Sequence, residues 1–246
     1  MPHQLGQTRS RRRADHLLQT PDTFVRAPLP GMKKATAIVH TSPAGGARFV
    51  QYTAEIEGGG QLGPTMGQRF VYVLDGQLEV ERRSLGPASF AYLPSGYASV
   101  VTATTAARVA VVEKPYQALA GVSAPSFFLG KEDAVTPTLL GDDPGLEVRG
   151  LVPDDPAFDF RVNTMTYQPG ASLAAVEVHV MEHGLLMLSG GGIYRLNADW
   201  YPVQAGDFIW MGPYCPQWFG AIGKAPAKYL IYKDWDRNPS AMSPEP

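Results

Sequence analysis

Short segments rich in β-branched and aromatic residues, separated by turns, fill most of the chain and limit the folds that it can adopt. Examples of these segments are RFVQYTAEI, RFVYVLDGQLEVE, GLLMLSGGGIYRL and KYLIYKD. The 26 glycines and 22 prolines lie between such segments and do not gather in one linker. Many short strands with regularly spaced turns are typical of a β-sandwich or β-barrel, and helix signals are scarce. We therefore expect an all-β protein.

The same order of strand, glycine turn, strand and aromatic strand occurs twice in the sequence. FVYVLDGQLEV at 70–80 leads to SFAYLPSG, and GLLMLSGGGIYRL at 184–196 leads to DFIWMGPY. A pattern that recurs at a nearly fixed offset indicates an internal repeat. The repeat predicts two β-barrel modules, residues 1–130 and residues 131–246, with a crossover rich in glycine, proline and aspartate between them.

Charge and composition exclude several classes of partner. The formal net charge is −2, so no overall field attracts nucleic acid or an anionic membrane. No run of about 18 apolar residues occurs, so no membrane-spanning helix is predicted. Cys215 is the single cysteine, which excludes an intrachain disulfide and favours a reducing compartment, and we expect a cytoplasmic protein. The arginines at 9 and 11–13 are interpreted as a solvated arm.

The segment EVHVMEHG carries the residues that point most directly to chemistry. If this segment is a strand, Glu177, His179 and His183 share one face, because side chains alternate with period two. One carboxylate and two imidazoles suit ions such as Mn, Fe or Zn. The alternative is a set of hydrogen-bonded polar residues that binds no metal. A fourth candidate ligand, Gln217, lies about one hairpin later, after a Pro-x-x-x-Gly-Asp motif.

These two segments resemble the two sequence motifs of cupins. In that pattern the first motif supplies two histidines and a glutamate, and the second motif supplies a further histidine. Here Glu177 stands at the first histidine position and His179 at the second, His183 takes the glutamate position, and Gln217 takes the last histidine position. The resemblance implies double-stranded β-helix barrels, or jelly rolls, in tandem as a bicupin, with a metal ion in the C-terminal module.

The N-terminal module provides an internal comparison. The repeat offset places Gly63, Thr65, Arg69 and Ser99 where the C-terminal module has its four candidate ligands. These residues are not a plausible set of metal ligands. The N-terminal module is therefore expected to be metal-free and to serve packing or oligomer contacts. We expect a homo-oligomer with one metal ion per chain.

A longer combination of motifs points to one family of bicupins. EVHVMEHG, LSGGGIY, AGDFIWMGPYCPQW and KYLIYKDWDRNP resemble the corresponding parts of (S)-ureidoglycine aminohydrolases. The resemblance implies that the four candidate ligands hold Mn²⁺. It implies that ureidoglycine is hydrolysed to ureidoglycolate and ammonia, a step of allantoin and purine catabolism. The substrate-binding positions of the family correspond to Glu177, Tyr194, Gln217, Tyr229 and Lys233.

The segment KYLIYKD bears independently on two of these residues. Tyr229, Ile231 and Lys233 share one strand face, so the tyrosine and the lysine can both point into a barrel. A lysine ammonium suits a substrate carboxylate. The alternative is a core tyrosine and a lysine whose ammonium reaches solvent at the strand end. With the family resemblance, Lys233 is expected to orient the substrate and Glu177 to accept a proton.

Two other functions fit the same ligand set. Two histidines and one carboxylate also bind the iron of non-haem dioxygenases. A bicupin that binds a ligand without catalysis is the second alternative. The expected substrate is in each case a small molecule, and for the aminohydrolase it is an anion.

Overall fold

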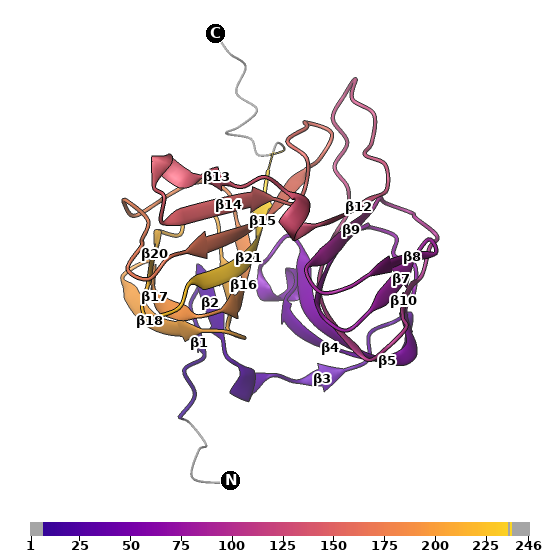
Figure 1. Ribbon diagram of the computed structural model, residues 1–246, viewed down its shortest axis with the longest axis horizontal. Coiled ribbons are helices and arrows are strands. Elements are labelled where there is room, and N and C mark those ends of the chain that lie inside the picture. The colour runs from indigo at the N-terminus through magenta and orange to yellow at the C-terminus, as the bar shows by residue number, and fades with distance from the viewer. Residues whose placement is uncertain (1–6, 236, 238–246) are drawn as a thin grey trace. The chain divides into compact units, whose positions relative to one another are not determined.

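The computed structural model describes residues 7–235 and 237, which form β-strands, short 3₁₀ turns and loops (Figure 1). No α-helix occurs among these residues, and the predicted all-β class is confirmed. Within the same part of the chain, there is no helix with the length and apolar character needed to cross a membrane.

Contacts within the chain divide it into two compact units. Unit 1 comprises Met1–Phe24, Thr136–Asp154 and Phe160–Pro246, and unit 2 comprises Val25–Val135 and Asp155–Asp159. The sequence repeat predicts a single boundary, whereas the chain passes between the units more than once. The N-terminal segment belongs to unit 1 with the C-terminal strands, because its strand His16–Gln19 pairs with the strand Phe208–Met211.

Unit 2 is built on one curled sheet whose main path is β12-β9-β6-β11-β5-β10-β7-β8, with β3 and β4 joined through β5 (Figure 1). Alternating apolar residues of β6 and β11, such as Val71 and Val109, build its core. The strands are β3 (Arg26–Ala27), β4 (Met32–Thr41), β5 (Val50–Leu62), β6 (Gln68–Asp75), β7 (Leu78–Val80), β8 (Arg83–Leu85), β9 (Ser89–Leu93), β10 (Val101–Ala103), β11 (Ala107–Lys114) and β12 (Phe128–Lys131).

Unit 1 contains two sheets. One has the order β1-β2-β19-β16-β21-β15-β14-β13, and the other has the order β18-β17-β20. Their strands are β1 (Arg11–Arg12), β2 (His16–Gln19), β13 (Thr138–Leu139), β14 (Leu146–Gly150), β15 (Phe160–Tyr167), β16 (His183–Ser189), β17 (Gly191–Leu196), β18 (Asp199–Gln204), β19 (Phe208–Met211), β20 (Gln217–Ala221) and β21 (Ala227–Asp234).

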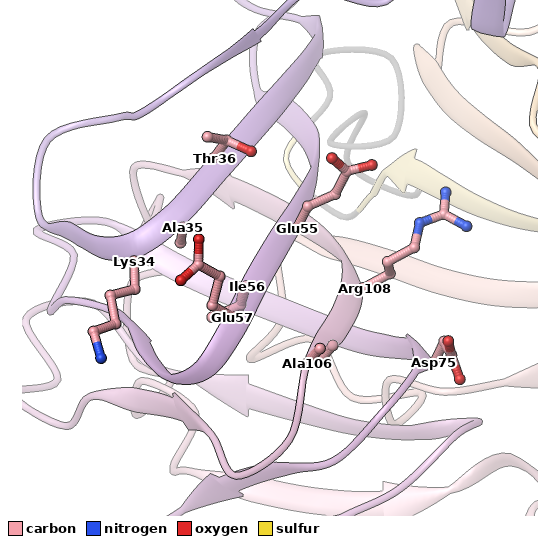
Figure 2. Close-up of a pocket in the computed structure, with 10 residues that line it drawn as sticks. Lys34, Ala35, Thr36, Glu55, Ile56, Glu57, Asp75, Ala106 and Arg108 are labelled. Carbon is pink, nitrogen blue, oxygen red and sulfur yellow. The ribbon is translucent and has the colours of Figure 1, made fainter.

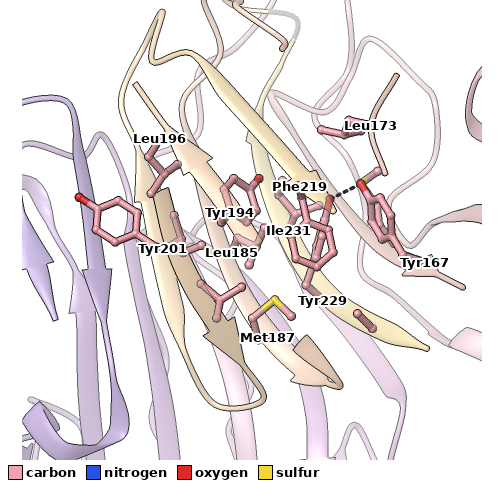
Figure 3. Close-up of a cluster of buried hydrophobic side chains, with 14 of the residues drawn as sticks. Tyr167, Leu173, Leu185, Met187, Tyr194, Leu196, Tyr201, Phe219, Tyr229 and Ile231 are labelled. Carbon is pink, nitrogen blue, oxygen red and sulfur yellow. Dashed lines mark hydrogen bonds between the residues drawn. The ribbon is translucent and has the colours of Figure 1, made fainter. Parts of the chain in front are cut away.

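Side chains from both sheets of unit 1 pack into one core that is rich in aromatic rings (Figure 3). The Phe219 ring lies edge-on to Tyr167, with 4.9 Å between ring centroids, and 5.5 Å from the Tyr194 ring. The hydroxyls of Tyr167 and Tyr229 lie 2.8 Å apart and form a hydrogen bond, so neither buried phenol lacks a partner. This aromatic core supports the strands that carry the candidate site.

The interpretation of the N-terminal arginines as a solvated arm needs correction at Arg9, whereas Arg11, Arg12 and Arg13 are exposed. β2 pairs with β19, and the Arg9 guanidinium donates two hydrogen bonds to the Asp207 carboxylate, at 2.7 and 2.8 Å. Asp207 is fully buried and also accepts a bond from the Gln204 backbone N–H. A buried carboxylate needs such partners, because an unpaired buried charge is costly.

Replacing Arg9 with glutamine is expected to lower the free energy of unfolding by about 2 kcal/mol, the scale of hydrogen bonds to a charged group. Arg13→Gln is the matched control, because Arg13 pairs with Asp199 at an exposed position and such pairs contribute less than about 1 kcal/mol. Urea unfolding measures both variants. Equal decreases in the free energy of unfolding would show that the burial of Asp207 does not strengthen its ion pair with Arg9.

Candidate active site

The four candidate metal ligands come together at one end of β20 and β16. Glu177 and Gln217 form a two-residue bridge, in which each backbone N–H donates to the carbonyl of the other, at 2.8 and 2.9 Å. His183 is the first residue of β16. His179 lies in the loop between them, and its carbonyl accepts a bond from the Tyr214 N–H. The continuous strand that the sequence predicts over 177–183 is therefore not formed.

Alternation of exposure holds only at the start of the motif, because Glu182 and His183 are adjacent and both buried. Val176 and Val178 are 38% and 57% exposed, whereas Glu177 and His179, which alternate with them, are less exposed as whole residues. The bridge to Gln217 keeps this part of the backbone extended, so period two persists without a strand ladder. The predicted alternation is therefore seen at Glu177 and His179 but does not continue to His183.

The imidazole rings of His179 and His183 face each other through their Nε2 atoms. The His183 Nδ1–H donates to the Tyr232 carbonyl at 3.3 Å, which leaves a lone pair on Nε2. That Nε2 lies 3.3 Å from Nε2 of His179, and the rings are nearly perpendicular. Burial lowers the pKa of both histidines, that of His183 strongly, and the nearby Lys233 lowers the pKa of both further. Neutral imidazoles are the form that binds metal ions.

The side chains of Gln217 and Glu177 complete the group. The Gln217 Nε2–H donates to His179 Nε2 at 2.7 Å, and Gln217 Oε1 accepts a bond from the Tyr194 hydroxyl at 3.3 Å. A Glu177 carboxylate oxygen lies 3.9 Å from His179 Nε2. Rotating the Gln217 amide by half a turn exchanges its oxygen and nitrogen with little change in shape.

This donor set fits a divalent cation. His183 presents the lone pair of its Nε2 at 3.3 Å from Nε2 of His179, so both nitrogens can face a single ion bound beside them. The Glu177 carboxylate and the Gln217 amide both lie close to His179 Nε2, so an ion bound to that nitrogen could also take an oxygen ligand from each. Nitrogen and oxygen donors in this combination suit Mn, Fe or Zn.

A second cluster of ligand-type residues lies elsewhere in unit 1. Ligand atoms of Asp15, His16 and Cys215 lie within 4.8 Å of one another. Both nitrogens of His16 are already hydrogen-bonded, Nδ1 with Asp15 and Nε2 with the Tyr201 hydroxyl, each at 2.9 Å. Burial raises the pKa of Cys215 to about 12, so its sulfur is a protonated thiol. The cluster is therefore satisfied as a hydrogen-bonded group.

A cavity of about 220 Å³ adjoins the first cluster. Its wall contains five of the predicted site residues, namely Glu177, Tyr194, Gln217, Tyr229 and Lys233. It also contains Ile231, which shares the strand face of Tyr229 and Lys233, and residues that the sequence did not single out, namely Thr138, Leu139, Leu140, Val148, Asn163, Met165 and Leu173. All of these residues belong to unit 1.

Lys233 lies on the cavity wall and not on the outer surface. It stands opposite His183 in the pairing of β21 with β16, on the face that also carries Tyr229 and Ile231. Burial lowers the pKa of Lys233, and the Glu177 carboxylate opposes part of this shift. Of the two readings of this lysine left open by the spacing, the structure therefore matches the one that points inward.

The corresponding part of unit 2 carries a different set of side chains. A cavity of about 380 Å³ is lined there by Gly63, Thr65 and Arg69. The buried Arg69 guanidinium donates to Glu113 Oε1 and to the Gly63 carbonyl, both at 2.7 Å. Ser99 donates to the Glu81 carboxylate. An arginine cannot bind a metal ion, so this cavity offers no ligand set like that of unit 1.

A third hollow lies on unit 2 and is lined by charged side chains of both signs (Figure 2). Figure 2 shows Glu55 and Arg108 on one side of it and Lys34 and Glu57 on the other. Glu55 is also paired with Arg26, at 2.7 Å. The lining residues include neither histidine nor cysteine, and mixed charges of this kind are typical of a solvated surface.

The segment that contains the candidate ligands matches a known domain family. A model of the cupin domain family matches residues 163–232, which include all four candidate ligands. The structure is similar to that of a putative glyoxylate-induced protein from Pseudomonas aeruginosa, with a TM-score of 0.85 and 29% identity. The match covers 94% of this chain and 93% of that one.

Two relatives carry a more specific name. (S)-Ureidoglycine aminohydrolase of Arabidopsis thaliana is 39% identical over 241 residues, 95% of this chain and 80% of the relative. The Escherichia coli K12 enzyme of the same name is 30% identical over 234 residues, covering 90% and 88%. The last residues of the motif KYLIYKDWDRNP lie outside the described residues, apart from 237. Because these similarities span both units and are not confined to the cupin segment, the chain belongs to the (S)-ureidoglycine aminohydrolase family, as its motifs predicted.

Proposed function

We propose that this protein hydrolyses (S)-ureidoglycine to (S)-ureidoglycolate and ammonia in ureide catabolism. One observation carries the proposal: two neutral imidazoles, a carboxylate and an amide converge beside a cavity whose wall also holds Lys233. The names of the Arabidopsis and E. coli relatives support the same reaction. The substrate is a small anion, which matches a cavity of about 220 Å³ with a lysine in its wall.

We assign Glu177, His179, His183 and Gln217 as the ligands of one Mn²⁺ ion per chain. When bound, the ion supplies a Lewis acid that polarises the substrate. Glu177 is the one anionic ligand of the four, and Gln217 is neutral. The loaded site therefore keeps a net positive charge, which favours an anionic substrate.

The reaction breaks the C–N bond to the amine and forms a C–O bond to water, and a proton of that water leaves with ammonia. Glu177 accepts this proton and delivers it to the departing amine, because its carboxylate lines the cavity and is partly open to solvent. Lys233 holds the substrate carboxylate and thereby fixes which face of the carbon meets water. Tyr194 holds Gln217 through its hydroxyl, and Tyr229 forms the adjoining wall.

We further propose that the two units are tandem cupin barrels, that unit 1 holds the metal ion and that unit 2 is metal-free. The Arg69–Glu113 ion pair supports this, because it places a fixed cation where unit 1 has His183 in the repeat. We keep the expectations of a cytoplasmic location and of a homo-oligomer, with no nucleic acid or membrane as partner.

An anaerobic assay tests the function directly. Freshly prepared ureidoglycine is added to metal-depleted protein, with and without Mn²⁺, and ammonia is measured. We expect release that requires the added ion and is unchanged by removal of oxygen. Oxygen uptake with Fe²⁺ and no ammonia would instead identify a dioxygenase, and binding without turnover would identify a ligand-binding bicupin.

Gln217→His is expected to keep one equivalent of Mn²⁺ and to lose about ten- to a hundredfold in kcat/KM, as changes around a metal centre often do. An imidazole restores the common cupin ligand, but it is shorter than glutamine and lacks the amide group that pairs with the Tyr194 hydroxyl. Gln204→His, at an exposed position of β18, controls for an added histidine. Parent-like turnover of Gln217→His would show that the amide has no special role in this reaction.

A further inference from the structure

One polar side chain in the cavity wall has no evident structural task. Asn163 lies on β15 and lines the cavity together with Glu177 and Lys233. Its side-chain amide forms no hydrogen bond within the described part of the chain. On the neighbouring strand it faces Gly150, where an added Cβ would lie 4.0 Å from Asn163 Oδ1. The absence of a side chain at Gly150 leaves the amide uncovered.

The surroundings of Asn163 favour an apolar residue at this position. Met165 and Tyr167, two and four residues further along β15, belong to the buried core. Ile231, the register partner of Asn163 on β21, belongs to the same core. Asn163 is half-buried, and an amide without a protein partner at such a position stabilises the fold less than an apolar side chain would, since it keeps only part of its hydrogen bonding to water. Hydrogen bonding to a bound molecule would explain why this position holds an asparagine and not an apolar residue.

The chemistry of the amide narrows the class of that molecule. A carboxamide presents one acceptor and two N–H donors side by side. A ureido group presents the complementary pair, a carbonyl oxygen and an adjacent N–H, so two parallel N–H···O bonds can form. A carboxylate offers acceptors alone and leaves the amide oxygen without a donor.

Lys233 lies at a suitable distance for the other end of the same molecule. Lys233 and Arg161 are paired on β21 and β15, as are Ile231 and Asn163, so Asn163 and Lys233 are diagonal neighbours on one face. Diagonal neighbours have Cα atoms roughly 7–8 Å apart. A small molecule with a carboxylate and a ureido group can therefore contact both side chains.

We propose that Asn163 binds the ureido group of the substrate while Lys233 binds its carboxylate. This inference rests on the proposed function, and it makes Asn163 a specificity-determining residue. It also predicts that Asn163 contributes nothing to folding. Asn163→Leu, which keeps the size and removes the polar atoms, should therefore melt no lower than the parent.

The test uses a ligand that cannot turn over. N-Carbamoylglycine has the ureido group and the carboxylate but no amine to release, and 4-methylpentanoate has nearly the same shape without the ureido group. Calorimetric titration of the manganese-loaded protein gives both dissociation constants. Asn163→Leu should weaken N-carbamoylglycine at least about tenfold, the effect of losing paired hydrogen bonds. It should leave 4-methylpentanoate nearly unchanged.

Two further variants complete the design. Thr166→Val makes a polar-to-apolar change on the opposite face of β15 and should alter neither constant. Asn163→Ala repeats the test with a smaller side chain if the leucine variant does not fold. Parent-like binding of N-carbamoylglycine by the Asn163 variants would overturn the inference, and so would equal weakening of both ligands. Parent protein that releases no ammonia from ureidoglycine would overturn the proposed function instead.

Discussion

Alanine at both His179 and His183 is expected to remove the metal ion and, with it, ammonia release from ureidoglycine. Both imidazoles present Nε2 to the same point, and no other pair of described histidines does so. A Lewis acid at the reacting centre is worth several kcal/mol, so kcat/KM should fall on the order of a thousandfold. Metal analysis after dialysis and steady-state ammonia assays measure the two losses.

His16→Ala is the matched control for this variant. His16 is also a buried histidine of unit 1 with a carboxylate and a thiol nearby, but its nitrogens are already hydrogen-bonded. It should lose stability, because Asp15 and Tyr201 each lose one hydrogen-bond partner, and keep its manganese. Our assignment would be contradicted if the double variant kept its metal ion or if His16→Ala lost it. Either result would indicate that the ion binds at the Asp15–His16–Cys215 cluster instead.

Lys233→Met should lower kcat/KM at least about thirtyfold, because deleting one partner of a partly buried ion contact costs about 2–5 kcal/mol. Methionine approximates the length and apolar contacts of the lysine stem, so fold and manganese content should not change. If the contact is equally strong in the ground and transition states, the loss appears in KM. If it orients the carbon for loss of ammonia, kcat falls as well.

Lys228→Met controls for the charge itself, because Lys228 lies on β21 with its side chain on the opposite face from Lys233. It should leave steady-state kinetics close to those of the parent. A small and similar change in the two variants would return Lys233 to the role of a lysine that reaches solvent. That result would also weaken the assignment of an anionic substrate.

Some of the site followed from sequence because its residues are close together along the chain. Tyr229 and Lys233 sit on one regular strand, so period two is enough to place both on the cavity wall. The ligand motif at 177–183 was found from spacing, although the strand behind that spacing is absent. The bridge between Glu177 and Gln217 keeps the backbone extended at the start of the motif, and the contact of His179 with His183 depends on the loop between them.

Other features depend on contacts that no local pattern reveals. Arg9 pairs with Asp207, 198 residues away, and a run of arginines alone resembles a solvated arm. Asp159 pairs with Lys114 inside unit 2, which is why the segment around it leaves unit 1. Asn163 carried a signal that was available, a polar residue on the inward face of an apolar strand. A role in binding could be inferred for Asn163 only once the structure placed it on the same cavity wall as Lys233.

The location of the metal ion is the most direct test of this account. Crystals grown with Mn²⁺ and measured near its absorption edge give an anomalous difference map that shows the ion itself. We predict one peak per chain, within bonding distance of Glu177, His179, His183 and Gln217, and none beside Arg69. A peak at Asp15, His16 and Cys215, a second peak in unit 2, or no peak at the four ligands would contradict it.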